Sequence, residues 1–200
     1  MQQSLFSSPL LPSLDLQEDA SEGYSRRTTL NAKSSDITLA FAVDFESAGE
    51  RLTKKVAMPD YVPINFGEKD LSKVFNCFLA ISQQSNKTDG LVINIAGNGQ
   101  YRFIKQGISQ DQVNLFVYKV LLYLISNKIP IKQIRTGGQT GADWAGLVAA
   151  VALEVPALGY FPKGFKQKNQ EGVTLENQHK DSLISSILKQ AQDLKNGANS

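Results

Sequence analysis

The sequence contains one cysteine and one histidine in 200 residues. A single cysteine cannot form a disulfide within the chain, and a single histidine cannot build a site that needs two imidazoles. We therefore expect no metal site, and we expect His179 to lie on the surface. Cys77 lies in the apolar run 74–79, where a packed core thiol is favoured over a nucleophile.

Long hydrophobic runs and a strong charge of either sign are also missing. No apolar stretch approaches the roughly 20 residues that span a bilayer, and residues 1–15 lack the basic region of a signal peptide. Lys and Arg number 21 against 19 Asp and Glu, and the formal charge of +2 does not favour a nucleic-acid partner. We expect a cytoplasmic protein with no membrane partner.

The composition divides the chain into two parts. Residues 1–36 are rich in serine, contain two prolines and show no sustained helical or strand period, so we expect a flexible leader. Its leucines offer an alternative, a short docking segment for a partner; they are Leu10, Leu11, Leu14 and Leu16. Because 42% of all residues are hydrophobic, we expect residues 37–200 to bury a core and form a single domain.

Strand-like and helix-like patterns alternate through this domain. Strands are expected at 37–45, 61–66, 90–96, 131–136 and 156–161, with a loop or turn over 47–55 and a polar loop from residue 165 through residue 177. Helices are expected at 68–85, from the Ser109–Gln112 capping-box pair to before Pro130, at 142–153 and at 183–194. This order predicts an α/β protein with a three-layer, Rossmann-like fold, in which helices cover both faces of a mainly parallel sheet.

Two glycine-rich loops follow expected strands. One is Gly97-Asn98-Gly99 and the other is Gly137-Gly138-Gln139-Thr140-Gly141. Parallel sheets bind ligands beyond the carboxyl ends of their strands, so we expect the amides of residues 138–141 and the Thr140 hydroxyl to hold a phosphate. Gln139 and Asn98 are expected to hydrogen-bond the rest of a nucleotide-like ligand. The glycine spacing matches neither the dinucleotide-binding motif nor the P-loop.

A structural interpretation of the second loop is also open. Thr140 and Asp143 have the spacing of a helix cap and its acidic partner, and Gly146 would let a helix pack closely on the sheet. The functional interpretation is favoured because two glycine loops, together with Asn94 and nearby amide side chains, exceed what capping requires.

Part of the chain resembles a known family. The run IRTGGQTGADWAGL at residues 134–147, followed by Pro162-Lys163-Gly164, is similar to the molybdenum-cofactor-carrier family of the SLOG superfamily. The resemblance covers about residues 131–165 and implies a SLOG-type, Rossmann-like domain that binds a nucleotide-derived ligand or a molybdopterin-type cofactor. Residues 48–55 and 94–101 are similar to uncharacterised phage-type proteins that share this motif.

The resemblance also implies roles for single residues. The positions that match the carrier motif are Gly137, Gly138, Gln139, Thr140, Gly141 and Asp143, and Lys163 in the later loop would supply a counter-charge. Two departures stand out. Thr136 replaces the usual serine, and Trp144 occupies the position of the catalytic glutamate of the phosphoribohydrolases in the same superfamily.

Three functions follow from these observations. Binding of a small phosphorylated ligand is favoured, with Gly99 and Arg51 as further candidate binding residues. The first alternative is hydrolysis of the N-glycosidic bond of a nucleotide, for which Asp143 and Glu50 are the candidate catalytic carboxylates. The second alternative is a non-catalytic scaffold for protein interactions. The sequence leaves the formation of a homo-oligomer open.

Overall fold

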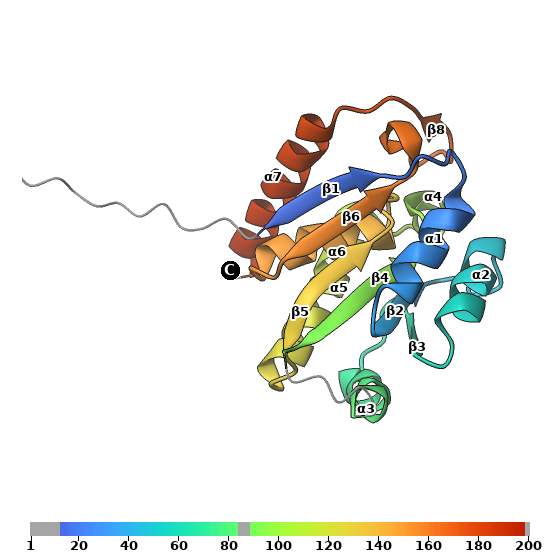
Figure 1. The fold of residues 1–200 in the computed structure, drawn as a ribbon. Helices are drawn as coiled ribbons and strands as arrows, with labels where there is room; N and C mark the ends of the chain where they lie inside the picture. Colours follow the sequence, from blue (N-terminus) through green and yellow to red (C-terminus); the bar gives the residue numbers. More distant parts are fainter. Residues whose placement is uncertain (1–12, 84–88, 199–200) are drawn as a thin grey trace, which may run out of the picture.

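The computed structural model describes residues 13–83 and 89–198. They form a six-stranded sheet with helices on both faces (Figure 1). All neighbouring strands in this sheet are parallel, and their order is β1-β6-β5-β4-β2-β3. The α/β class and the three-layer, Rossmann-like architecture expected from the sequence are confirmed.

The strands of the main sheet are β1 (Leu14–Glu18), β2 (Ile37–Ala42), β3 (Tyr61–Asn65), β4 (Leu91–Gly97), β5 (Ile131–Thr136) and β6 (Ala157–Phe161). A small antiparallel pair consists of β7 (Gln167–Lys168) and β8 (Thr174–Leu175). The helices are α1 (Tyr24–Lys33), α2 (Ala48–Ala57), α3 (Leu71–Ser82), α4 (Gln100–Ile104), α5 (Gln110–Ser126), α6 (Ala142–Ala152) and α7 (Lys180–Ala198), with a short 3-10 turn, η1 (Lys163–Phe165).

Helices α3, α5, α6 and α7 cover one face of the sheet, and α1 and α2 lie on the other (Figure 1). Every residue of α6 is buried, as expected for a helix that is apolar nearly all round. Gly146 lets α6 approach the sheet, because a Cβ there would lie 2.8 Å from side-chain atoms of Ile95 and Thr136. The Ser109–Gln112 capping box that starts α5 is present as expected.

The described part of the expected leader is not a flexible tail. Residues 14–18 form β1, which pairs with β6, and residues 24–33 form α1. The strand was not recognised because it is short and Leu16 is its one buried side chain. The helix was not recognised because its buried residues include Arg27 and Asn31 rather than an apolar stripe. Residues 1–12, including Leu10 and Leu11, lie outside the described residues.

Three smaller expectations are also wrong. Residues 48–57 form α2 rather than a loop, and Ser47 caps this helix by accepting a hydrogen bond from the Glu50 amide. Cys77 is exposed because the turns of α3 bury Val74 and Phe78 instead. The polar stretch after residue 165, expected as a loop, contains the β7–β8 pair. Residues 84 and 85, the end of the helix expected at 68–85, lie outside the described residues.

Candidate functional site

The two glycine loops meet at the carboxyl edge of the sheet, as the sequence predicts. The Ala142 amide donates to the carbonyl oxygen of Asn98 (3.1 Å), and the Gln100 amide donates to that of Thr140 (3.2 Å). Gly141 has a φ of 90°, and a Cβ there would lie 2.3 Å from the Asn98 carbonyl oxygen. Glycine is needed at this position so that the two loops can touch.

The backbone amides of the second loop are already used by the protein. Gly138 donates to Thr136 Oγ1 (3.0 Å), Gln139 to Asp143 Oδ2 (3.3 Å), Thr140 to Gln139 Oε1 (3.0 Å) and Gly141 to Gln110 Oε1 (2.7 Å). The Thr140 hydroxyl donates to the Lys168 carbonyl (2.5 Å). The expectation that these amides and this hydroxyl hold a phosphate is therefore wrong for this conformation of the loop.

The capping interpretation also needs correction. The N-cap of α6 is Gly141, which has no side chain, and Asp143 accepts from the amide of Gln139, which precedes the helix. Thr140 and Asp143 therefore do not form a capping box. The side chains of Gln110, Gln139 and Asp143 fasten the loop instead.

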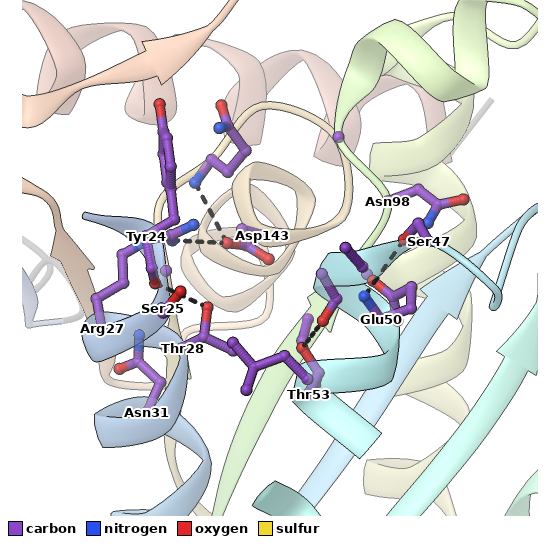
Figure 2. Close-up of a pocket in the computed structure, with 18 of the residues that line it drawn as sticks. Tyr24, Ser25, Arg27, Thr28, Asn31, Ser47, Glu50, Thr53, Asn98 and Asp143 are labelled. Atoms are coloured by element: carbon purple, nitrogen blue, oxygen red, sulfur yellow. Dashed lines mark hydrogen bonds and ion pairs between the residues drawn. The ribbon is translucent and has the colours of Figure 1, made fainter. Parts of the chain in front are cut away.

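A pocket of about 380 Å³ opens beside this loop, between α1, α2 and the carboxyl ends of β4 and β5 (Figure 2). Six of the residues expected at the site line it: Glu50, Asn98, Gly99, Gly137, Gln139 and Asp143. The other five, Arg51, Gly138, Thr140, Gly141 and Lys163, are not among its lining residues. The pocket thus lies at the predicted edge of the sheet but faces α1 and α2.

Helix α1 supplies a wall that sequence reasoning missed. Tyr24, Arg27, Thr28 and Asn31 all line the pocket. Their spacing of i, i+3, i+4 and i+7 places them on one side of a helix. A polar stripe at a helical period was the available signal in the sequence, but the same pattern is typical of a solvent-exposed helix face.

An ion pair joins α1 to the second glycine loop. Arg27 Nη1 lies 3.0 Å from Asp143 Oδ2, both side chains are buried, and the Arg27 guanidinium stacks 5.3 Å from the centroid of the Tyr24 ring. Gly137 provides the space, because a Cβ there would lie within van der Waals overlap of Arg27 Nη1. Gly137 is therefore needed to seat this guanidinium.

Glu50 of α2 lies on the other side of the pocket (Figure 2). Its side chain is buried, and Oε2 has no hydrogen-bond partner. Burial, followed by the negative charges of Asp143 and Asp44, raises the pKa of Glu50 to about 8. The site therefore contains a carboxyl group that is protonated at neutral pH.

Asp143 differs from Glu50 in having a cation beside it. Burial raises the pKa of Asp143, and the ion pair with Arg27 together with the amide hydrogen bonds opposes this rise by favouring the carboxylate. Burial thus raises the pKa of both carboxyl groups, and Asp143 differs in having a buried cation and amide donors that favour its charged form.

Cationic and aromatic side chains also line the pocket. Arg102 pairs with Asp44 (2.6 Å), and its guanidinium lies 5.4 Å from the centroid of the Tyr101 ring. Lys168 of β7 lies over the same ring, with Nζ 5.6 Å from the centroid. Lys168 forms no ion pair within the described part of the chain.

The cations expected from the sequence are placed differently. Lys163 is exposed on η1, and its amide donates to the Ser21 carbonyl. Arg51 is exposed on α2, and its Nη1 donates to the Glu46 carbonyl (2.7 Å). Lys168 and Arg102, rather than Lys163 and Arg51, are the basic residues that reach the pocket alongside Arg27.

The amide side chains at the site have different environments. Asn98 Oδ1 accepts from the amides of Val43 and Asp44, and its Nδ2 donates to the Asp44 carbonyl. Gln139 Oε1 accepts from the amides of Thr140 and Lys168. Both side chains hold loops in place and have few groups left for a ligand. Asn31, by contrast, has no hydrogen-bond partner for either atom of its side-chain amide.

Residues 13–83 and 89–198 contain neither a metal-binding cluster nor a membrane-spanning helix. Within these ranges, no group of three or more His, Cys, Asp or Glu side chains could hold a metal ion. No helix in the same ranges has the length and apolar character needed to cross a membrane.

Comparison with known proteins gave a match over part of the chain. No curated protein and no solved structure matches it significantly. Residues 134–178 match the profile of the circularly permutated YpsA SLOG family. This region supplies Gly137, Gln139, Asp143 and Lys168 to the pocket. The match covers less than half of the chain, and over these residues the chain is similar to this SLOG family.

Proposed function

We propose that the pocket between α1 and α2 binds a nucleotide-derived, phosphorylated small ligand. One observation carries this proposal: a pocket at the carboxyl edge of a parallel sheet contains buried polar atoms without partners. They are Glu50 Oε2, Arg27 Nε, the Tyr24 hydroxyl oxygen and both side-chain amide atoms of Asn31. Each such atom costs about 1–3 kcal/mol when it is buried without a hydrogen bond, and a polar ligand would remove that cost.

The basic residues indicate where a phosphate would bind. Lys168 lines the pocket, carries no ion pair in the described chain and lies over the Tyr101 ring. Arg102 stands beside the same ring, although Asp44 already neutralises part of its charge. We therefore assign the phosphate to Lys168 and Arg102 rather than to the loop amides. The local similarity of residues 134–178 to a SLOG family supports a nucleotide-related ligand.

A molybdopterin-type cofactor belongs to the same chemical class. It combines a phosphate with a fused heterocycle that presents hydrogen-bond donors and acceptors, and the unpartnered groups of Asn31 and Glu50 would suit such a ring. When bound, this group would supply a dithiolene for molybdenum. The described residues offer no cluster of metal ligands of their own, so the protein would act on it as a carrier.

A second candidate function is cleavage of an N-glycosidic bond, and the Glu50–Asp143 pair favours it. Protonated Glu50 would give its proton to the leaving nitrogen of the base as the C1′–N bond breaks. The Asp143 carboxylate would stabilise the positive charge that develops on the sugar. Water would then form the C1′–O bond and return a proton to Glu50, so that the products are free base and ribose phosphate.

Calorimetric titration of the full chain with nucleoside monophosphates tests the binding proposal. The expected result is saturable binding that weakens at least tenfold in Lys168→Ala, because a counter-charge is lost. Lys163→Ala is the matched control, since Lys163 is exposed outside the pocket, and its affinity should equal that of the wild type. Equal weakening in both variants, or no binding at all, would contradict the proposal. Chromatography of the same mixtures for free base separates binding from cleavage.

A further inference from the structure

Asn31 is a buried polar residue of the pocket whose side chain has no hydrogen bond within the described part of the chain. Its side chain is 2% exposed, and neither Nδ2 nor Oδ1 has a partner. It lines the pocket from α1, seven residues after Tyr24, which is about 10 Å further along the helix. Figure 2 shows Asn31 and Thr28 on α1, with Glu50 and Thr53 on α2 opposite.

Each of the other asparagines that are buried in the described part of the chain has a side-chain hydrogen bond. Asn98 has bonds on both atoms of its side-chain amide, and Asn114 of α5 accepts from Gln110 and donates to Gln190. Asn94 donates to Thr38 Oγ1. Because burying an unpaired amide is costly, the exception at Asn31 points to a partner that comes from outside the chain.

Thr28 and Thr53, which line the pocket with Asn31, already donate their hydroxyl protons within the protein. The Thr28 hydroxyl donates to the Tyr24 carbonyl, and the Thr53 hydroxyl donates to the Gly49 carbonyl, each at 3.0 Å. The oxygens of Thr28 and Thr53 can therefore act only as acceptors toward a ligand. Asn94 also lines the pocket, and the carbonyl oxygen of its side-chain amide is an acceptor as well. This end of the pocket thus places hydroxyl acceptors beside the Nδ2 donor of Asn31, while Arg27 Nε and the protonated carboxyl of Glu50 are further donors of the same pocket.

We infer that Asn31 and its neighbours form a subsite for an amino-substituted nucleobase, whose exocyclic amine donates to the acceptors while an adjacent ring nitrogen accepts from Asn31 Nδ2. A side-chain amide matches this donor–acceptor edge in two parallel hydrogen bonds. The inference rests on the proposed function and adds the part of the ligand that α1 recognises. It also orders the ligand: the base lies at Asn31 and the phosphate lies toward Lys168.

Nucleotides that differ by one group test this inference. Adenosine monophosphate carries an amine where inosine monophosphate carries an oxo group, and cytidine and uridine monophosphates form the same kind of pair. We expect the wild type to bind the better amino nucleotide at least tenfold more tightly than its oxo partner. Ribose 5-phosphate, which lacks a base, should bind more weakly than either.

The variant Asn31→Leu removes both polar atoms and keeps the approximate shape of the side chain. It should lose at least tenfold in affinity for the amino nucleotide and should no longer discriminate within each pair. Because the wild-type amide is unpartnered, the melting temperature of ligand-free Asn31→Leu should be equal to or above that of the wild type. The matched variant Asn114→Leu breaks two existing bonds, so its melting temperature should fall while discrimination is kept.

The possible results separate the two proposals. If no nucleotide binds the wild type, the proposed function fails and the base subsite fails with it. If nucleotides bind and Lys168→Ala lowers their affinity, the proposed function stands. The base subsite is nevertheless overturned if the amino and oxo nucleotides bind with equal affinity, or if Asn31→Leu leaves the affinities unchanged. A lower melting temperature in ligand-free Asn31→Leu would assign Asn31 a structural role and also overturn it.

Discussion

The Arg27 guanidinium contacts the Asp143 carboxylate at 3.0 Å, across 116 residues of sequence, and both side chains are buried. This ion pair fastens α1 to the loop that precedes α6. One partner lies in the region first expected to be a flexible leader, and the other lies in the segment that matches the SLOG family profile. The wall of the pocket formed by α1 therefore depends on this contact.

Replacing Arg27 with Met should lower the free energy of unfolding by about 3–5 kcal/mol, because Asp143 would remain buried without its cation. Chemical denaturation measures this change. Arg51→Met is the control: Arg51 is exposed, and its replacement should cost less than about 1 kcal/mol. A loss below about 1 kcal/mol for Arg27→Met would show that the pair does not hold α1.

Glu50 should make the stability of the protein depend on pH. The pKa of Glu50 is about 8 in the folded chain and near 4.5 when unfolded, so the folded state holds one more proton between these values. Stability should therefore fall as pH rises from about 4.5 to 8, by about 1.4 kcal/mol per pH unit, and then level off.

The variant Glu50→Gln should lack the part of the pH dependence of stability that comes from Glu50, because an amide does not titrate. Its melting temperature should exceed that of the wild type by a margin that grows as pH rises through this range. Thermal melts at pH 5, 6, 7 and 8 make the comparison. Parallel curves for the two proteins would mean that Glu50 ionises in the folded state as it does in water.

Gly138 should tolerate a side chain poorly for two reasons. Its φ is 69°, and a Cβ there would overlap the Phe161 ring, at 2.3 Å from Cζ. We expect Gly138→Ala to cost about 3 kcal/mol, combining left-handed strain with overpacking. Gly107 has a similar φ of 72° but no atom within 4 Å of a Cβ, so Gly107→Ala should cost about 1 kcal/mol. Equal costs would contradict the packing role of Gly138.

Much of the fold could be predicted because the central elements carry strong patterns. The strand expected at 131–136 is β5, and the helix expected at 142–153 differs from α6 by one residue. The capping box at Ser109 fixes the start of α5. The edge strand β1 and helix α1 were missed because their stability comes from pairing and packing with distant segments, such as β6, which local composition does not reveal.

The edge of the sheet at which the pocket lies was predictable, but most of the side chains that line the pocket were not. Parallel topology brings Asn98 and Gly137 to the same edge, and the glycine pattern indicated that edge. The amides of 138–141 were assigned wrongly because nothing local shows that Gln110, on another helix, takes the Gly141 amide. Tyr24, Arg27 and Asn31 were missed because a polar face on a short helix resembles a solvated one.

The binding of a nucleotide between α1 and α2 is tested most directly by following backbone amide resonances of the 15N-labelled chain during titration with nucleoside monophosphates. We predict saturable shifts for residues 24–31, 47–53 and 94–102, with small changes at Asp111 and Asp193 in the second hollow between α5 and α7. Shifts confined to the α5–α7 hollow, or spectra that no nucleotide alters, would contradict the account.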